Sequence, residues 1–130
     1  MPIFMTSPKA PSESDIRRAQ QLFNEEAFFE CHEALEALWK EAEDPEVKLL
    51  LQAVIHVAVA LHHRKEGNLN GFENQVRKGL IKLYSVDLKQ MTGVMRFDLN
   101  TFRNQVVRLK NQPKSNTPLP KLINGSAGRP

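Results

Sequence analysis

The chain has 130 residues, of which 41% are hydrophobic and 25% are charged, and its formal net charge is +3. This length and apolar content suit about one domain with one modest core. The longest apolar run, residues 54–61, contains a histidine and is too short to cross a bilayer, and no secretory pattern opens the chain. The sequence therefore predicts a cytoplasmic protein with no membrane partner, and its single cysteine excludes an internal disulfide.

The charges divide unevenly between the two halves of the chain. Residues 1–66 hold 7 Lys and Arg against 12 Asp and Glu, whereas residues 67–130 hold 11 against 3. An acidic half and a basic half can pair within the fold, between subunits of a homo-oligomer, or with an anionic partner. The basic half carries no recognised nucleic-acid-binding motif, so nucleic acid is not an expected partner.

The predicted elements are all helices, and polar or proline-rich segments flank them. Residues 1–12 and 111–130 lack an apolar period and are predicted to be flexible tails around a helical domain at 13–110. Within that domain, the spacing of apolar residues predicts helices over 13–25, 27–42 and 45–66. A fourth helix is expected from about 70 to 84 and a short fifth from 98.

Capping residues give the predicted helix boundaries. Ser12 starts a capping-box-like pattern, and Asp44 with Pro45 suits the N-cap and first position of the third helix. Asn70 and Asp98 can cap the fourth and fifth helices. Because the connections are short, neighbouring helices should run antiparallel. We therefore predict an all-α fold, a single-domain antiparallel helical bundle of four to five helices.

The second predicted helix carries a histidine and acids among core residues. His32 and Trp39 lie on the apolar stripe that begins at Phe28, because their spacing keeps them on one face of a helix. Glu36 follows His32 by one turn, so the two side chains can converge, and Glu33 flanks them. This helix is expected to direct a polar group toward the interior.

The third predicted helix is apolar on nearly every face. Within residues 49–61 the only polar side chains are Gln52 and His56, and His63 falls on the same narrow stripe at 100° per residue. His62 points about 100° away, toward solvent or another helix. Polar groups in such a helix need partners.

The two polar stripes have a physical reason to face each other. An unpaired buried polar group costs about 1 to 3 kcal/mol, and an unpaired buried charge costs more. We therefore predict one buried cluster between the second and third helices. Its members are His32, Glu33, Glu36, Gln52, His56 and His63.

Three interpretations of this cluster remain open. It can be a hydrogen-bond network that only fixes helix packing, as in a structural or interaction module. It can be a divalent metal site, for zinc or iron, because a His and Glu one turn apart plus facing histidines are workable ligands. The metal ligands would then be His32, Glu36, His56 and His63.

The third interpretation is a pocket that binds a small polar ligand or performs acid–base chemistry. His32 would act as the base and Glu36 would orient it, with Trp39 lining the pocket. The ligand-binding residues in this interpretation are His32, Glu33, Glu36, Trp39, Gln52 and His63. Cys31 points 100° away from His32 and is expected to be a small apolar group, not a nucleophile. The residues assign no reaction, so the pattern leaves enzymatic activity open.

The same residues carry a family resemblance. The runs FNEEAFFECHEALEALWK and LLQAVIHVAVALHHRKEGNLNG closely resemble a family of small helical proteins of bacteria and archaea, domain of unknown function 309. The resemblance covers residues 16–83, with H-E-x-x-E-x-x-W at its centre, and implies an all-helical fold without an established activity. Ala53 stands where the family usually has glycine, and His56 where it has glutamine, so the family pattern implies no role for His56.

Overall fold

The structure, a computed structural model, describes residues 11–112 and 116–125. In these residues it contains six α helices and no strand apart from an isolated bridge between Phe97 and Asn124. The predicted all-α class is confirmed. The described residues form six helices, whereas the sequence predicts four to five.

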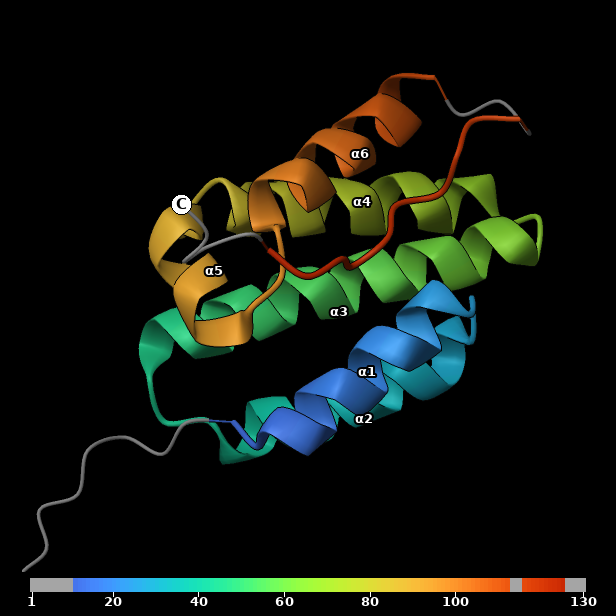
Figure 1. The fold of residues 1–130 in the computed structure, drawn as a ribbon. Coiled ribbons are helices and arrows are strands. Elements are labelled where there is room, and N and C mark those ends of the chain that lie inside the picture. The colour runs from blue at the N-terminus through green and yellow to red at the C-terminus, as the bar shows by residue number, and fades with distance from the viewer. Residues whose placement is uncertain (1–10, 113–115, 126–130) are drawn as a thin grey trace, which may run out of the picture.

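The helix boundaries follow the predicted capping residues closely. Ser12, Asp44 and Asp98 each accept a backbone hydrogen bond at the start of a helix, as predicted. The predicted cap Asn70 is wrong, because the side chain of Asn68 accepts the Gly71 N–H at 2.9 Å and starts that helix earlier. The helices are α1 (Glu13–Asn24), α2 (Phe28–Glu41), α3 (Pro45–Lys65), α4 (Leu69–Leu83), α5 (Leu88–Met95) and α6 (Leu99–Asn111) (Figure 1).

Helix α5 is the one helix of the described residues that the sequence pattern does not predict. It has only eight residues, and Gly93 lies inside it. Its signals are nevertheless present: Asp87 accepts the Gln90 N–H at 3.2 Å, and Leu88 and Met91 are buried at helical spacing. A helix this short shows too few turns for its period to stand out.

The helices form two layers around α3. Helix α3 makes its most extensive contacts with α2 and α4, which flank it on either side (Figure 1). The second layer, α1 and α6, lies in front of these three helices in Figure 1. The Phe23 ring of α1 packs edge to face on Phe28 of α2 at 5.4 Å and on Phe102 of α6 at 5.5 Å. These rings join the two layers into one core.

The described part of the C-terminal segment differs from the flexible tail that the sequence predicts. Leu122 is 0% exposed, and its carbonyl accepts hydrogen bonds from the side chains of Gln20 and Asn24 at 2.7 and 2.9 Å. The Asn24 carboxamide oxygen also accepts the Leu122 N–H at 2.8 Å. The prolines prevent a helix in this segment. The segment is nevertheless ordered at Leu122, because its side chain is buried and its backbone groups are hydrogen-bonded to α1. The predicted tails at 1–10, 113–115 and 126–130 lie outside the described residues.

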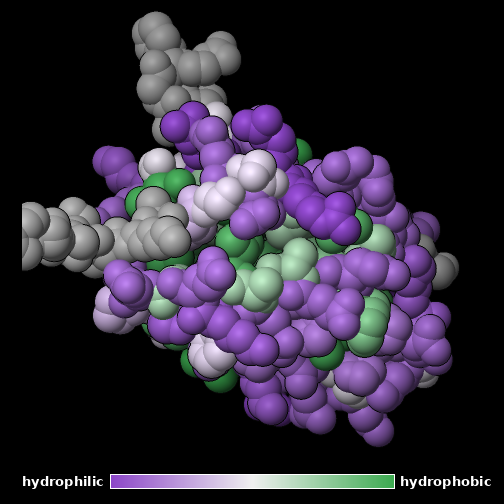
Figure 2. Space-filling view, turned by 90° about the horizontal axis from the view of Figure 1, so that it is seen from below, coloured by the Kyte–Doolittle hydropathy of each residue, from purple (hydrophilic) through white to green (hydrophobic). Residues whose placement is uncertain are grey.

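Helix α3 is the most apolar element of the fold. Its 21 residues have a mean hydropathy of 1.3 over the most apolar stretch, enough by length and composition alone to cross a membrane. Half of that stretch is buried inside the structure. The side on which α1 and α2 lie is by contrast mostly hydrophilic, with a small group of hydrophobic residues near its centre (Figure 2).

Candidate functional site

The predicted site begins with an imidazole–carboxylate pair on α2. Phe28, Cys31 and Leu35 anchor this helix in the core, and His32 and Glu36 emerge beside them on the flank toward α3. His32 Nε2 lies 3.3 Å from Glu36 Oε2, as their one-turn spacing predicts. The two side chains are 24% and 47% exposed, so water reaches both. Glu33 is exposed beside them.

Trp39 lies where the end of α2 contacts the start of α3. The Lys48 ammonium lies 4.3 Å from the centre of the indole ring and donates a hydrogen bond to the Trp39 carbonyl at 2.6 Å. Trp39 is half-buried and packs against the core. Its ring is therefore held by a cation–π contact at the start of α3.

A row of aromatic rings joins the other end of α2 to α3. The Phe29 ring lies 5.8 Å from the rings of both His32 and His62, and the His62 and His63 rings are 6.3 Å apart. Phe29 was not among the predicted site residues, whereas His62, predicted to point toward solvent or another helix, contacts this ring of α2. The short connection at residues 42–44 could have revealed this contact, because it places the first turn of α2 beside the last turn of α3.

His56 and His63 face α4 and do not face α2. His56 Nδ1 lies 2.7 Å from the Gln75 side-chain oxygen, and His63 Nδ1 lies 3.3 Å from the Asn68 amide nitrogen. A Cβ atom on Gly71 of α4 would come within 2.7 Å of the His63 ring, so the helix backbone passes directly beside it. The structure thus corrects the expectation that both histidines meet the α2 pair.

The predicted single buried cluster is not confirmed. None of the described residues that are fully buried is polar or charged, and His32, Glu36, Gln52, His56 and His63 are all half-buried. In the part of the chain that the structure describes, no group of three or more His, Cys, Asp and Glu side chains is arranged to hold a metal ion. The physical reason is that α3 lies between two helices, so its polar stripe is divided between them.

The protonation chemistry of this region is limited. Burial lowers the pKa of His56 from 6.5, the Gln75 hydrogen bond opposes that shift, and the charges of Lys82 and Lys78 lower the pKa further. Burial raises the pKa of the Cys31 thiol to about 12, and the thiol donates a hydrogen bond to the Ala19 carbonyl at 3.4 Å. His56 is therefore neutral at pH 7, and Cys31 is not a nucleophile.

The predicted residues share one surface instead, which we call the open face. On this side of α3 every residue is half-buried, whereas the residues of the opposite side are buried. One flank is the α2 row His32, Glu33, Glu36 and Trp39, and the other is the α4 row Gln75, Lys78 and Lys82. The α3 residues of the open face are Lys48, Leu49, Gln52, Ile55, His56, Val59, His62 and His63.

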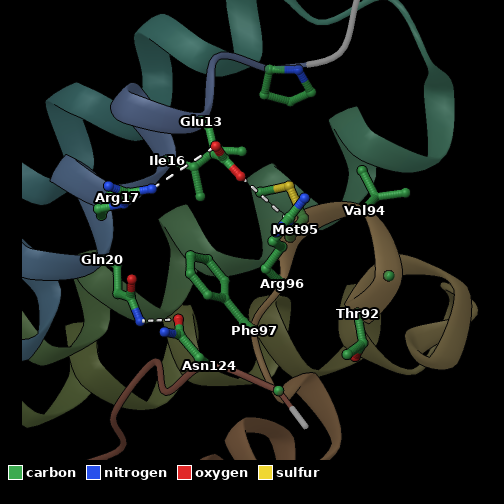
Figure 3. Close-up of a pocket in the computed structure, with 13 residues that line it drawn as sticks. Glu13, Ile16, Arg17, Gln20, Thr92, Val94, Met95, Arg96, Phe97 and Asn124 are labelled. Carbon is green, nitrogen blue, oxygen red and sulfur yellow. Dashed lines mark hydrogen bonds and ion pairs between the residues drawn. The ribbon is translucent and has the colours of Figure 1, made fainter. Parts of the chain in front are cut away.

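A pocket of about 670 Å³ lies elsewhere, between α1, the end of α5 and the C-terminal segment (Figure 3). Its apolar side includes Ile16 and Phe97. At its rim, Glu13 pairs with Arg17 at 3.9 Å and with Arg96 at 3.4 Å. These three side chains are largely exposed, and the pocket contains none of the residues singled out from the sequence.

Comparisons with known proteins place the open face within a recognised domain. Residues 16–75 match the family described as "Domain of unknown function (DUF309)". A stretch of 68 residues is 34% identical to an "Uncharacterized protein" of Aquifex aeolicus (strain VF5), covering 52% of this chain. The stretch spans only 20% of that relative's length.

The matched segment runs from α1 into α4 and contains all of the open face except Lys78 and Lys82. It leaves out α5 and α6 and most of the pocket in Figure 3. The family resemblance seen in the sequence is thus confirmed: residues 16–75 of this chain match the DUF309 family.

Proposed function

We propose that this chain is a non-catalytic interaction module and that the open face is its docking surface. One observation carries the proposal: α3 is apolar enough by length and composition to cross a membrane, yet only half of the residues in its apolar stretch are buried and the others stay partly exposed. Leu49, Ile55 and Val59 remain half-buried on the uncovered side. Contiguous apolar surface rimmed by polar residues is typical of a protein interaction site.

The energetics favour docking at this face. Covering its apolar atoms would contribute about 25 cal/mol per Å² of area removed from water. The polar side chains Gln52, His62 and the His32–Glu36 pair keep enough exposure to stay hydrated in the free chain. They can therefore make specific hydrogen bonds to a partner without first breaking a buried network.

The chemistry of the neighbouring groups supports binding more than catalysis. The His32–Glu36 pair could orient a general base, but the nearest thiol, Cys31, is buried and protonated. The pocket in Figure 3 is lined by other residues, so it does not place a substrate against this pair.

Site-specific photocrosslinking tests the proposal. A benzophenone side chain replaces Val59 on the open face or, as a control, exposed Asn104 on α6. We expect discrete covalent protein adducts from position 59 only, and we expect Ile55→Lys to abolish them. Equal labelling from both positions, or adducts that survive Ile55→Lys, would contradict a docking surface here.

A small polar ligand or metal at the His32–Glu36 pair is the second candidate function. It is favoured by the 3.3 Å pair itself and by the Phe29 ring 5.8 Å away, which forms an aromatic side to the site. Elemental analysis of protein purified without added metal tests it. Near-stoichiometric zinc, iron or nickel that disappears in His32→Ala would support the site. A metal-free chain in which His32→Ala only lowers the Tm would favour the interaction module.

A further inference from the structure

The two flanks of the open face carry opposite charges. Glu33 and Glu36 project from α2, while Lys78 and Lys82 project from α4, on the other side of α3. The Lys78 and Lys82 charges are close enough to α3 to lower the pKa of His56. The face is thus acidic along one edge and basic along the other.

The opposite charges also lie at the same level along α3. On the α2 side, Phe29 contacts His62 and Trp39 contacts Lys48, so Glu36, between them, is level with Gln52 and Ala53. On the α4 side, the backbone of Gly79 passes so close to α3 that a Cβ atom there would lie 3.1 Å from the Ala53 carbonyl oxygen. Lys78, the residue before Gly79, is therefore level with the same turn of α3 as Glu36.

A two-fold axis makes this arrangement self-complementary. If the axis lies in the plane of the face and parallel to α3, rotation places the α2 flank of one copy over the α4 flank of the other. The rotation moves nothing along α3, so Glu36 of each copy comes opposite Lys78 of its partner copy. An axis perpendicular to α3 would instead set α4 against α4 and bring the lysines of both copies together.

The size of the face suits such a contact. Helix α3 has 21 residues, so it is about 31 Å long at 1.5 Å per residue. With a neighbouring helix axis about 8 to 10 Å away on each side, the face covers about 600 Å² per copy. The total of about 1,200 Å² reaches the lower end of the range for specific protein interfaces.

We propose that the open face binds a second copy of this chain, in a two-fold dimer whose axis runs parallel to α3. The inference rests on the proposed docking function of that face and names the partner. Leu49, Ile55 and Val59 of both copies form the apolar centre, and two Glu36–Lys78 pairs close its edges. The pairs select the orientation of the two copies. Opposite charges meet when the axis is parallel to α3, whereas like charges meet when it is perpendicular to α3.

A charge exchange between two variants tests this geometry. In sedimentation-velocity experiments across a concentration series, wild type should change from monomer to dimer. We expect Glu36→Lys or Lys78→Glu alone to weaken association about tenfold or more, because each substitution puts two like-charged pairs into the dimer. Mixing the two variant chains should restore association, since a heterodimer has two oppositely charged pairs, one as in the wild type and one with its charges exchanged.

Matched controls separate this effect from a general change in charge. Glu41→Lys changes an exposed acid at the end of α2 that points away from the face, and Lys89→Glu changes an exposed lysine on α5. Both should dimerise as wild type does. Circular dichroism should show that all four variants keep the helical content of the wild type.

The outcomes distinguish this inference from the proposed function. A wild-type chain that stays monomeric at about 100 μM, or a Glu36→Lys and Lys78→Glu mixture that fails to recover, overturns the dimer. If position 59 then crosslinks to a different protein, the docking function stands and only the identity of the partner is wrong. If position 59 gives no adduct that depends on Ile55, both proposals fail.

Discussion

The two sides of α3 are built from one helix but meet different surroundings. The side toward α1 and α6 presents only apolar residues, among them Leu50, Val54 and Leu61, and all of these are buried. The open side places Gln52 and its histidines among leucine, isoleucine and valine, and every one of them is half-buried. Polar residues in an apolar helix thus mark the side that the fold leaves uncovered, where water reduces their desolvation cost.

Phe102→Ala should produce the largest loss of stability, because it acts on the covered side. The ring is fully buried and packs edge to face on Phe23. We expect the free energy of unfolding to fall by about 3 to 5 kcal/mol, measured by urea denaturation. Ile55→Ala on the open side, measured at a concentration that keeps the chain monomeric, should cost about 1 kcal/mol or less. Similar losses for both variants would show that the open side is covered after all.

Leu122→Ala should be the next largest effect. Leu122 is fully buried although it lies in a segment predicted to be flexible, and its backbone bonds to Asn24 hold it there. We expect a loss of about 2 to 4 kcal/mol in the same denaturation experiment. Ile123→Ala is the control, since the Ile123 side chain is 45% exposed. A segment that is flexible in solution would make both substitutions nearly neutral.

Gly79→Ala should have a moderate effect, because it acts where α4 meets the edge of the open face. A Cβ atom there would lie 3.0 Å from the Val57 side chain and 3.1 Å from the Ala53 carbonyl oxygen. We expect a loss of about 1 kcal/mol, since overpacking exceeds the gain in helix propensity. Gly93→Ala in α5 meets nothing within 4 Å and should instead raise the Tm. If both variants were stabilised, α3 and α4 would not be in close contact.

His56→Gln should produce the smallest effect, visible only in the pH dependence of stability. Burial lowers the pKa of His56 below 6.5 in the folded chain, so the unfolded chain takes up the proton first as the pH falls. The wild type therefore loses stability on acidification through that range. Urea denaturation at pH 7.5 and pH 5.5 should show a smaller loss for His56→Gln, which keeps an amide to bond Gln75. An unchanged pH dependence would mean that the imidazole is fully hydrated.

Much of the fold could be predicted from local signals in the sequence. The apolar period revealed the long helices, and Asp44 and Asp98 marked two of their starts, because capping depends on a few neighbouring residues. Helix α5 and the buried position of Leu122 were not predicted. Both belong to short segments that gain their order from contacts with distant parts of the chain. Local patterns carry little information about such contacts.

The candidate site was predicted residue by residue but not as an assembly. The one-turn spacing of His32 and Glu36 correctly predicted their pair, because that distance is set within a single helix. The partner of His56 could not be predicted in this way, because two helices flank α3 and the sequence gives no preference between them. The backbone of α4 approaches α3 closely at Gly71 and Gly79. This register places Gln75 beside His56 and makes it the hydrogen-bond partner.

The sequence by itself determined the all-helical class, the boundaries of the long helices, the family match of residues 16–75 and the identity of the polar residues on α2 and α3. Only the tertiary structure decided that those residues lie on an open face instead of in a buried cluster. The physical reason is that helical period specifies which residues share one side of a helix. Whether that side is covered depends on how the other helices and the C-terminal segment pack, and contacts between distant parts of the chain decide that packing.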